Sequence, residues 1–283
     1  MAKKHNIIIV GNGLFGSIAA RLARAEGHAV TVISDDQPLS ASKASGCVLA
    51  PSWLNSMDKA AIETAMAVLG ILFRVHDMEF QTALRPFKAK RVALADVLVE
   101  PDFAGHVYAI EDGKVFWVDN YERAHQSRGK VLVAAGIWCK DLIPGMPTMR
   151  GLYGASVVFK GVQLDAPRLS VWAPYKQAVG FNLDKKHVWF GDGTALIEKT
   201  WGKRGEEAKE ATIYRGQHML AEARAAQPGI KGHATVGIRP YVEGRKAGYF
   251  ERVSHSTWVS TGGAKNGTVL AAYQAAEFLR SLP

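Results

Sequence analysis

The chain of 283 residues is 48% hydrophobic and 22% charged, which predicts a globular protein with a large core or two joined lobes. Its two cysteines, Cys47 and Cys139, belong to no CxxC pair or Cys/His cluster, which argues against a disulfide scaffold and a metal site and favours a reducing cytoplasm. No apolar run is long enough for a transmembrane helix, and the basic N-terminus leads directly into a short strand, so we expect neither membrane insertion nor secretion.

The first forty residues have the pattern of one βαβ unit. Residues 5–10 predict a strand, GNGLFG a tight turn, residues 17–28 a helix and residues 29–34 a second strand. Residues 57–75 have a wide apolar face at helical spacing and predict a second helix. Asn55 and Ser56 precede it and are its candidate N-caps.

The remaining elements are mainly strands. Residues 106–119 contain two β-rich runs around Glu-Asp-Gly, which predicts a hairpin, and KVLVAAG at 130–136 predicts a buried strand. Residues 152–193 predict several antiparallel strands, and the polar segment 203–226 predicts a half-exposed helix over them. At the end of the chain we expect a strand at 255–261, a glycine turn at 262–267 and a helix at 268–281.

The opening glycine turn carries a dinucleotide-binding fingerprint. Gly11, Gly13 and Gly16 form GxGxxG directly after a strand and directly before a helix, which is the context the motif requires. The first glycine permits the tight turn, the second leaves room for a diphosphate, and the third lets the helix approach the strand. The N-terminus of that helix offers N–H groups and a positive dipole end to the phosphates.

A carboxylate that binds a ribose hydroxyl is expected at the end of the second strand of such a unit. Here Ser34 occupies that position and Asp35 follows it. Either the Ser34 hydroxyl binds the ribose or Asp35 reaches it from one residue later. The fingerprint alone does not choose between FAD and NAD.

Three further segments resemble the D-amino-acid oxidase family, in particular its glycine oxidase and sarcosine oxidase-like branch. ASKASGCVLAPSW at 41–53 is similar to the family's loop of serine and small residues that runs past the flavin. KVLVAAGIWCKDL at 130–142 resembles its buried strand ending in Ala-Gly. GIRPYVEGRKAGYFERVSHSTWVSTGGAKNGTVLAA at 237–272 is the most specific, being similar to the family's Gly-x-Arg-Pro followed by a Gly-rich loop and a terminal helix.

The resemblance implies that FAD is the cofactor and that both ends of the chain hold it. The residues it assigns to FAD binding are Gly11, Gly13, Leu14, Phe15, Gly16, Ser34, Asp35, Ser45, Gly46, Cys47, Ala135, Gly136, Trp138, Gly262, Gly263, Ala264, Lys265, Asn266, Gly267 and Thr268. Cys47 is expected to be a buried, inert thiol beside the flavin, without a covalent bond to it.

The resemblance also implies chemistry: hydride transfer from the carbon next to an uncharged amine to flavin N5, then hydrolysis of the imine. Its catalytic candidates are Arg239, whose guanidinium suits a substrate carboxylate, Lys265, whose charge would stabilise the reduced flavin, and Tyr241. A structural ion pair for Arg239 and a solvated loop position for Lys265 are the alternatives. Trp172 and Tyr175 join Tyr241 as candidates for the substrate pocket or the core.

The expected fold class is α/β, with a Rossmann-type FAD-binding domain and a reduced antiparallel β-sheet substrate domain. Residues 1–76, 106–147 and 235–283 are assigned to the first domain, and 77–105 and 148–234 to the second. The chain departs from the family in three ways: it is shorter, mainly before residue 106, Ser34 replaces the usual acid, and Gly263 stands where histidine is frequent. Much of the substrate lid is therefore expected to be missing.

The net charge of +9 and the shortened lid suggest an open site for an amine displayed on a polyanion such as DNA. Short phage-encoded relatives of glycine oxidase that act on amino-acid-modified thymine are the precedent. The candidate phosphate contacts are RPFKAKR at 85–91, Lys203, Arg204, Arg245 and Lys246, with Phe87 or Trp201 for stacking. A plain solvated surface, a flavin-binding subunit without turnover and an NAD(P)-dependent reductase remain as other interpretations.

Overall fold

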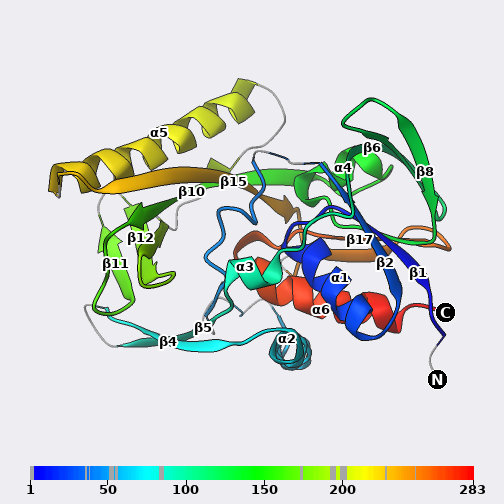
Figure 1. The fold of residues 1–283 in the computed structure, drawn as a ribbon, viewed down its shortest axis with the longest axis horizontal. Helices are drawn as coiled ribbons and strands as arrows, with labels where there is room; N and C mark the ends of the chain where they lie inside the picture. Colours follow the sequence, from blue (N-terminus) through cyan, green and yellow to red (C-terminus); the bar gives the residue numbers. More distant parts are fainter. Residues whose placement is uncertain are drawn as a thin grey trace.

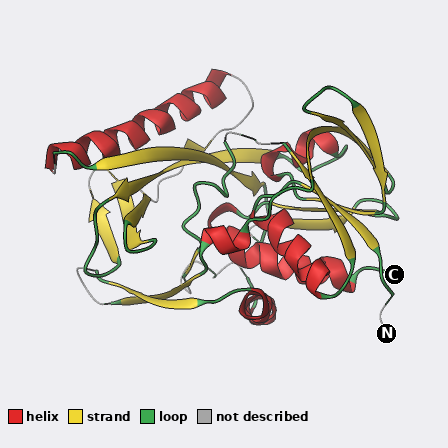
Figure 2. Cartoon of the chain, in the orientation of Figure 1, coloured by secondary structure: helices red, strands yellow, loops and turns green. Residues whose placement is uncertain are grey.

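The computed structural model describes residues 3–35, 37, 39–50, 54, 57–82, 86–172, 175–191, 196–197, 203–226, 228–245 and 247–283. Two sheets dominate these residues, and helices cover one side of each (Figures 1 and 2). No helix among them has the length and apolar character needed to cross a bilayer.

The first sheet has eight strands in the order β16-β17-β9-β1-β2-β6-β7-β8. Their bounds are β1 (Asn6–Val10), β2 (Ala29–Ser34), β6 (Phe103–Glu111), β7 (Lys114–Asp119), β8 (Ala124–Arg128), β9 (Lys130–Val133), β16 (Tyr249–Arg252) and β17 (Thr257–Thr261). β1, β2, β9 and β17 run parallel to one another. The predicted βαβ unit, the hairpin at 106–119 and the buried strand at 130–136 are therefore confirmed, whereas β8 was not predicted.

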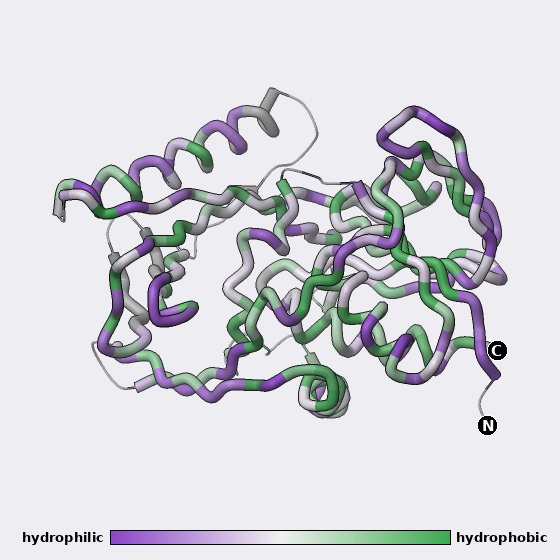
Figure 3. The backbone as a smooth tube through the Cα atoms, in the orientation of Figure 1, coloured by the Kyte–Doolittle hydropathy of each residue, from purple (hydrophilic) through white to green (hydrophobic). Residues whose placement is uncertain are grey.

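Alternate residues of β1 face different cores. Ile7 and Ile9 belong to the cluster under the helices α1 (Leu14–Ala25), α2 (Lys59–Leu72) and α6 (Gly267–Arg280). Ile8 and Val10 belong to a second cluster on the opposite face of the sheet. Because successive strand residues point to opposite faces, β1 is apolar throughout and both of its faces are buried. Figure 3 shows hydrophobic residues gathered in this central part of the fold.

The helix predicted at 57–75 is shorter than expected and has a different cap. α2 begins after Asp58, whose carboxylate Oδ1 accepts a hydrogen bond of 2.7 Å from the Ala61 backbone N–H. Asn55 and Ser56, the caps expected from the sequence, lie outside the described residues. α1 also begins earlier than expected, at Leu14, so that Gly16 lies inside its first turn.

The second sheet has the order β11-β12-β13-β10-β14, and β15 pairs with β10. The strands are β10 (Met149–Lys160), β11 (Arg168–Trp172), β12 (Tyr175–Asn182), β13 (His187–Gly191), β14 (Leu196–Ile197) and β15 (Lys231–Val242). α5 (Lys203–Ala226) packs on β10 and β15, as predicted, and carries mostly hydrophilic residues (Figures 1 and 3). β15 is a single strand that runs through residue 235, the expected domain boundary.

A third sheet, which the sequence did not predict, joins the two parts. It has the order β3-β5-β4, with β3 (Val48–Leu49), β4 (His76–Phe80) and β5 (Phe87–Arg91). The short elements α3 (Leu94–Val97), α4 (Cys139–Leu142), η2 (Gly136–Trp138) and η3 (Ala264–Asn266) complete the described elements. Since β3 follows directly from the loop at 40–47, this sheet holds that loop between the first and second sheets.

Candidate functional site

The opening glycine turn is fixed by close backbone packing. Gly11 has a φ of +99°, and a Cβ there would lie 2.7 Å from the carbonyl oxygen of Ala134 at the end of β9. A Cβ on Gly16 would overlap the carbonyl oxygen of Gly11. Gly11 and Gly16 therefore set how closely α1 approaches β1 and β9, which is the role their spacing predicts.

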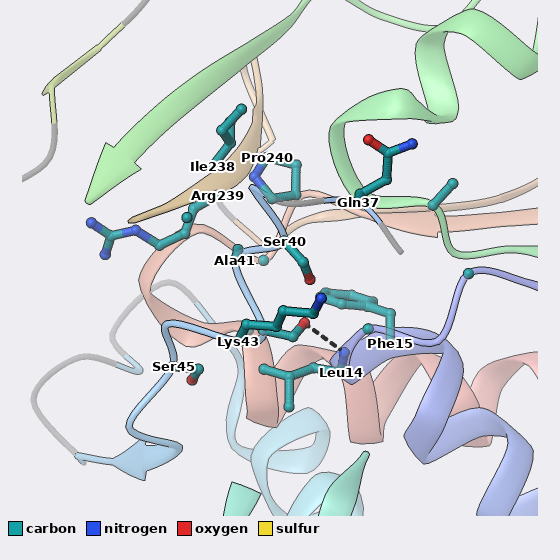
Figure 4. Close-up of a pocket in the computed structure, with 18 of the residues that line it drawn as sticks. Leu14, Phe15, Gln37, Ser40, Ala41, Lys43, Ser45, Ile238, Arg239 and Pro240 are labelled. Atoms are coloured by element: carbon teal, nitrogen blue, oxygen red, sulfur yellow. Dashed lines mark hydrogen bonds between the residues drawn. The ribbon is translucent and has the colours of Figure 1, made fainter. Parts of the chain in front are cut away.

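The loop at 40–48 covers the start of α1. The Leu14 backbone N–H donates a hydrogen bond of 2.8 Å to Ser42 Oγ, drawn as the dashed line in Figure 4. A Cβ on Gly13 would lie 2.9 Å from the same hydroxyl oxygen. Ser42 was not among the predicted site residues, because no local pattern distinguishes it from the neighbouring serines of the loop.

Polar residues gather at the end of β2. Ser34 Oγ donates a hydrogen bond of 2.9 Å to Oδ1 of Asn12, which lies in the glycine turn. Asn12 therefore orients the Ser34 hydroxyl, which stands where the usual acid would be. The Asp35 carboxylate accepts from Gln37 Nε2 at 2.6 Å and lies 3.1 Å from His106 Nδ1. Ser34 and Asp35, the two residues considered for the ribose, thus lie at one end of the site. Their partners Asn12, Gln37 and His106 were not among the predicted site residues.

The closing glycine turn meets the opening one. A Cβ on Gly263 would lie 2.6 Å from Gly267 Cα and 2.8 Å from Cε2 of the Phe15 ring. A Cβ on Gly267 would lie 3.9 Å from Leu14 Cδ1. Thr261 Oγ1 also donates to the carbonyl oxygen of Gly136 at 2.9 Å, which joins the end of β17 to the turn after β9.

A cavity of about 460 Å³ connects these segments with the second sheet. Its wall includes most of the predicted cofactor-binding residues: Gly11, Gly13, Leu14, Phe15, Ser34, Asp35, Ser45, Gly46, Cys47, Ala135, Gly136, Trp138, Gly263, Ala264, Gly267 and Thr268. Gly16, Gly262 and Asn266 are not part of this wall. The Lys265 side chain, like those of Trp172 and Tyr175, lies outside the described part of the structure.

Arg239 lines the cavity at the end formed by the second sheet. It is half-buried in β15, opposite Leu152 of β10, and its side chain extends away from Phe15 and Gln37 in Figure 4. Tyr241, two residues later, is half-buried opposite Arg150 and is not part of the cavity wall. The adjacent Pro240 is part of that wall, and the catalytic role of Tyr241 stays a prediction.

An aromatic wall faces this end and was not predicted. Trp189 lines the cavity and stacks on Phe181, with ring centroids 5.1 Å apart and planes 24° apart. A Cβ on Gly46 would lie 3.1 Å from Phe181 and 3.2 Å from Trp189, so a larger side chain in the loop would push this wall outward. Gly46 is far from Phe181 and Trp189 in sequence, so pattern analysis could not predict that they meet.

Cys47 adds a buried thiol to the wall. The residue is 2% exposed, and its φ of +48° is unusual for a side chain other than glycine. Burial raises the pKa of the thiol, against the opposing effect of hydrogen bonds with Ser45 and Thr268. The thiol is therefore protonated at neutral pH, which is the chemical form of an inert residue.

Comparisons with known proteins give the class of fold. No family model and no curated protein matches the sequence. Iminodiacetate oxidase from Chelativorans sp. BNC1 is similar with a TM-score of 0.63 and 14% identity, over 98% of this chain and 96% of that chain. Glycine oxidase from Geobacillus kaustophilus is similar with a TM-score of 0.61 and 12% identity, over 100% and 96%.

Glycerol-3-phosphate dehydrogenase from Bacillus halodurans, in complex with FAD, is similar with a TM-score of 0.58 and 13% identity, over 99% of this chain and 64% of that chain. At these identities the likeness concerns the fold. The expected fold class is confirmed: the chain combines a Rossmann-type FAD-binding fold with an antiparallel sheet domain, as FAD-dependent oxidoreductases do.

Proposed function

We propose that the chain is an FAD-dependent oxidoreductase that oxidises the C–N bond of a glycine-like amine. The observation that carries this proposal is that two glycine turns, far apart in sequence, meet at Phe15 and Gly263 and line one cavity. An extended dinucleotide needs a site to which both turns contribute. A glycine turn that binds nothing has no need to face a cavity together with another turn.

The donor set fits FAD. The start of α1 has no acidic residue in its first turn, and a Cβ at Gly13 would lie 2.9 Å from the Ser42 hydroxyl oxygen, so glycine leaves room between the helix and the loop. The dipole of α1 therefore favours a diphosphate there. Ser34 and Asp35 would bind the ribose beside the adenine, and Gly136, Gly263 and Ala264 would lie against the flavin ring.

When bound, FAD would supply the acceptor for a hydride from the carbon next to the amine. The chain's own residues would supply alignment and exclusion of water. Arg239 would hold a substrate carboxylate through a bidentate pair, because its guanidinium presents two parallel N–H groups. Trp189 and Phe181 would shield the opposite side, and effective alignment of this kind is worth roughly 7–11 kcal/mol.

Anaerobic reduction tests this function directly. The flavin-loaded protein is mixed without oxygen with glycine, sarcosine or D-alanine, and the visible absorption of the oxidised flavin is followed. We expect at least one amine to bleach it. A flavin that stays oxidised with all of them, and with glycyl-modified nucleosides, would leave a binding subunit without turnover. A colourless protein that binds NAD(P)H would indicate the reductase.

A second candidate is the same chemistry on an amine carried by DNA, and a cluster of lysines favours it. Lys160, Lys185, Lys186 and Lys231 are exposed at the tip of the second sheet, and none forms an ion pair with a described residue. Lys160 and Lys231 lie directly opposite each other in the β10–β15 register, and the Gly161 N–H donates to the Lys186 carbonyl oxygen. Like charges placed opposite each other are unfavourable alone and suit an anionic partner.

This lysine tip differs from the phosphate contacts expected from the sequence. Arg85, Trp201 and Lys246 lie outside the described residues, as do the side chains of Lys203 and Arg204, and Lys90 pairs with Asp77 at 2.6 Å. The tip lies roughly 17 Å along β10 from Ala155 on the cavity wall, a spacing within one DNA duplex width.

Salt-dependent DNA binding distinguishes the two substrates. We expect binding that falls steeply with added salt and is weakened by a Lys160→Glu, Lys231→Glu double variant. Lys59→Glu, on the exposed side of α2, is the matched control. If the protein does not bind DNA even at low salt, the proposal of an amine carried by DNA is excluded and the free amine remains as the substrate.

A further inference from the structure

Tyr108 of β6 presents an aromatic ring at the edge of the cavity. The residue is 52% exposed. Of the large apolar residues that are exposed in the described part of the chain, Tyr108 is the one that lines the cavity. A single exposed aromatic residue elsewhere on the surface needs no explanation. On a cavity wall, however, the same ring offers its face to a ligand that enters the cavity.

An irregularity in the pairing of β6 with β7 determines the position of Tyr108. Val107 pairs with Trp117 and Ala109 pairs with Phe116, so Tyr108 is the extra residue of a β-bulge. Bulges redirect side chains and are frequent next to active sites. The ring centroids of Phe116 and Tyr108 lie 6.4 Å apart, and Phe116 is not part of the cavity wall. Phe116 therefore supports the Tyr108 ring without occupying the cavity.

Tyr108 belongs to the end of the cavity where the ribose of FAD is expected. His106, two residues earlier on β6, also lines the cavity, and its Nδ1 lies 3.1 Å from the carboxylate of Asp35, a candidate ribose ligand. Two residues of a strand span about 7 Å, which is comparable with the reach of a purine base attached to that ribose. α4 lies beside β6 (Figure 1), and its residue Leu142 lines the cavity as well.

We propose that the ring of Tyr108 stacks on the adenine of FAD. This inference rests on the proposed function, which makes FAD the ligand. Adenine has a planar π face, and stacking on an aromatic side chain contributes substantially to the binding of a base. The stack would also remove the exposed face of the tyrosine ring from water. With Asp35 at the ribose and Tyr108 at the base, this end of the site would favour FAD over FMN, which has no adenine.

Binding measurements on Tyr108→Ala and Tyr108→Phe test the proposal. Dissociation constants for FAD and FMN are measured by fluorescence titration of the flavin-free protein. Loss of a base–aromatic stack should make Tyr108→Ala bind FAD about 5–150-fold more weakly than wild type does. Tyr108→Phe keeps the ring and should bind FAD as wild type does. Because FMN lacks the adenine, wild type and Tyr108→Ala should have the same affinity for it.

Tyr121→Ala is the matched control, since Tyr121 is 79% exposed in the turn between β7 and β8 and does not line the cavity. It should leave the FAD affinity unchanged. Equal FAD affinity of wild type and Tyr108→Ala would overturn the inference alone. An FMN affinity that falls by the same factor as the FAD affinity would also overturn it, because the effect would then not depend on adenine. A wild-type protein that binds no FAD would overturn the proposed function itself.

Discussion

Gly263 packs against the ring of Phe15: a Cβ on this glycine would lie 2.8 Å from Phe15 Cε2. The two residues come from opposite ends of the chain, one from the turn that opens α1 and the other from the turn that precedes α6. Because both turns line the same cavity, this contact determines the width of the site between them.

Substitution of Gly263 should therefore damage both stability and FAD binding. In Gly263→Ala the added methyl would lie 2.6 Å from Gly267 Cα and would press on Phe15. Overpacking of this kind costs about 1–3 kcal/mol, and we expect a comparable loss of unfolding free energy. The FAD dissociation constant should rise about tenfold, measured by flavin fluorescence.

Gly70→Ala is the matched control for that substitution. Gly70 lies inside α2, and a Cβ there meets nothing within 4 Å. Alanine should raise the unfolding free energy by up to about 1 kcal/mol, because glycine is a poor helix former, and FAD affinity should not change. If Gly263→Ala and Gly70→Ala had the same effect on unfolding free energy and FAD affinity, the contact between Gly263 and Phe15 would not determine the width of the site.

Arg239 should control the affinity for amines that carry a carboxylate. Arg239→Gln removes the guanidinium but keeps a polar side chain, and we expect KM for glycine or sarcosine to rise about 10–100-fold through loss of a charge-assisted pair. Amines without a carboxylate should be unaffected. Arg123→Gln, with a side chain 68% exposed in the β7–β8 turn, is the control. An unchanged KM would assign Arg239 to a structural role.

Both thiols should be unreactive in the folded protein. Burial raises the pKa of Cys47, and raises that of Cys139 to about 12, so little thiolate exists at pH 8 and alkylation should accelerate only at higher pH. Mass spectrometry after iodoacetamide treatment should show no label on the native protein and two labels in urea. The FAD should also be released by acid precipitation. Flavin that stays with the precipitated chain would contradict the non-covalent assignment of Cys47.

Asp112 should make stability depend on pH. Its Oδ1 accepts hydrogen bonds of 2.6 Å from Ser254 Oγ and from the Ser256 N–H, which lower the pKa of the carboxyl below its usual value of 3.8. A lowered pKa in the folded state means stabilisation that is present above the unfolded value and is lost as pH falls through the folded value. Asp112→Asn should therefore lower Tm at pH 7.

The difference in Tm between wild type and Asp112→Asn should shrink as the pH is lowered below about 3.8, the usual value for the carboxyl. Glu100→Gln is the control, since exposed Glu100 has no hydrogen bond or ion pair with a described residue. A difference that stays constant down to pH 2 would show that the carboxylate charge contributes nothing.

Local patterns predicted the parts of the site that lie within one βαβ unit or one turn. Gly11, Gly13 and Gly16 could be assigned because their spacing and their flanking strand and helix are both visible in sequence. α5 was predicted with its observed bounds, since it is a long polar segment in which apolar residues recur at intervals.

Contacts between distant segments could not be predicted in this way. Ser42 caps α1 from a loop 28 residues away, and Trp189 reaches the cavity from the second sheet. Asp58 replaced the expected caps of α2 because several polar residues precede that helix and only the fold selects among them. The three-stranded sheet escaped notice because β4 is mostly exposed and β3 has only 2 residues, so neither strand has a clear apolar pattern.

The most direct test is a titration of the flavin-free protein with FAD, followed by visible absorption, for wild type and for Gly13→Val. A side chain on Gly13 would fill the space beside Ser42 in which the diphosphate is expected to lie. We predict that wild type binds one FAD per chain and that Gly13→Val, still folded by circular dichroism, does not. A wild-type protein that binds no FAD, or a Gly13→Val variant that binds it equally well, would contradict the account.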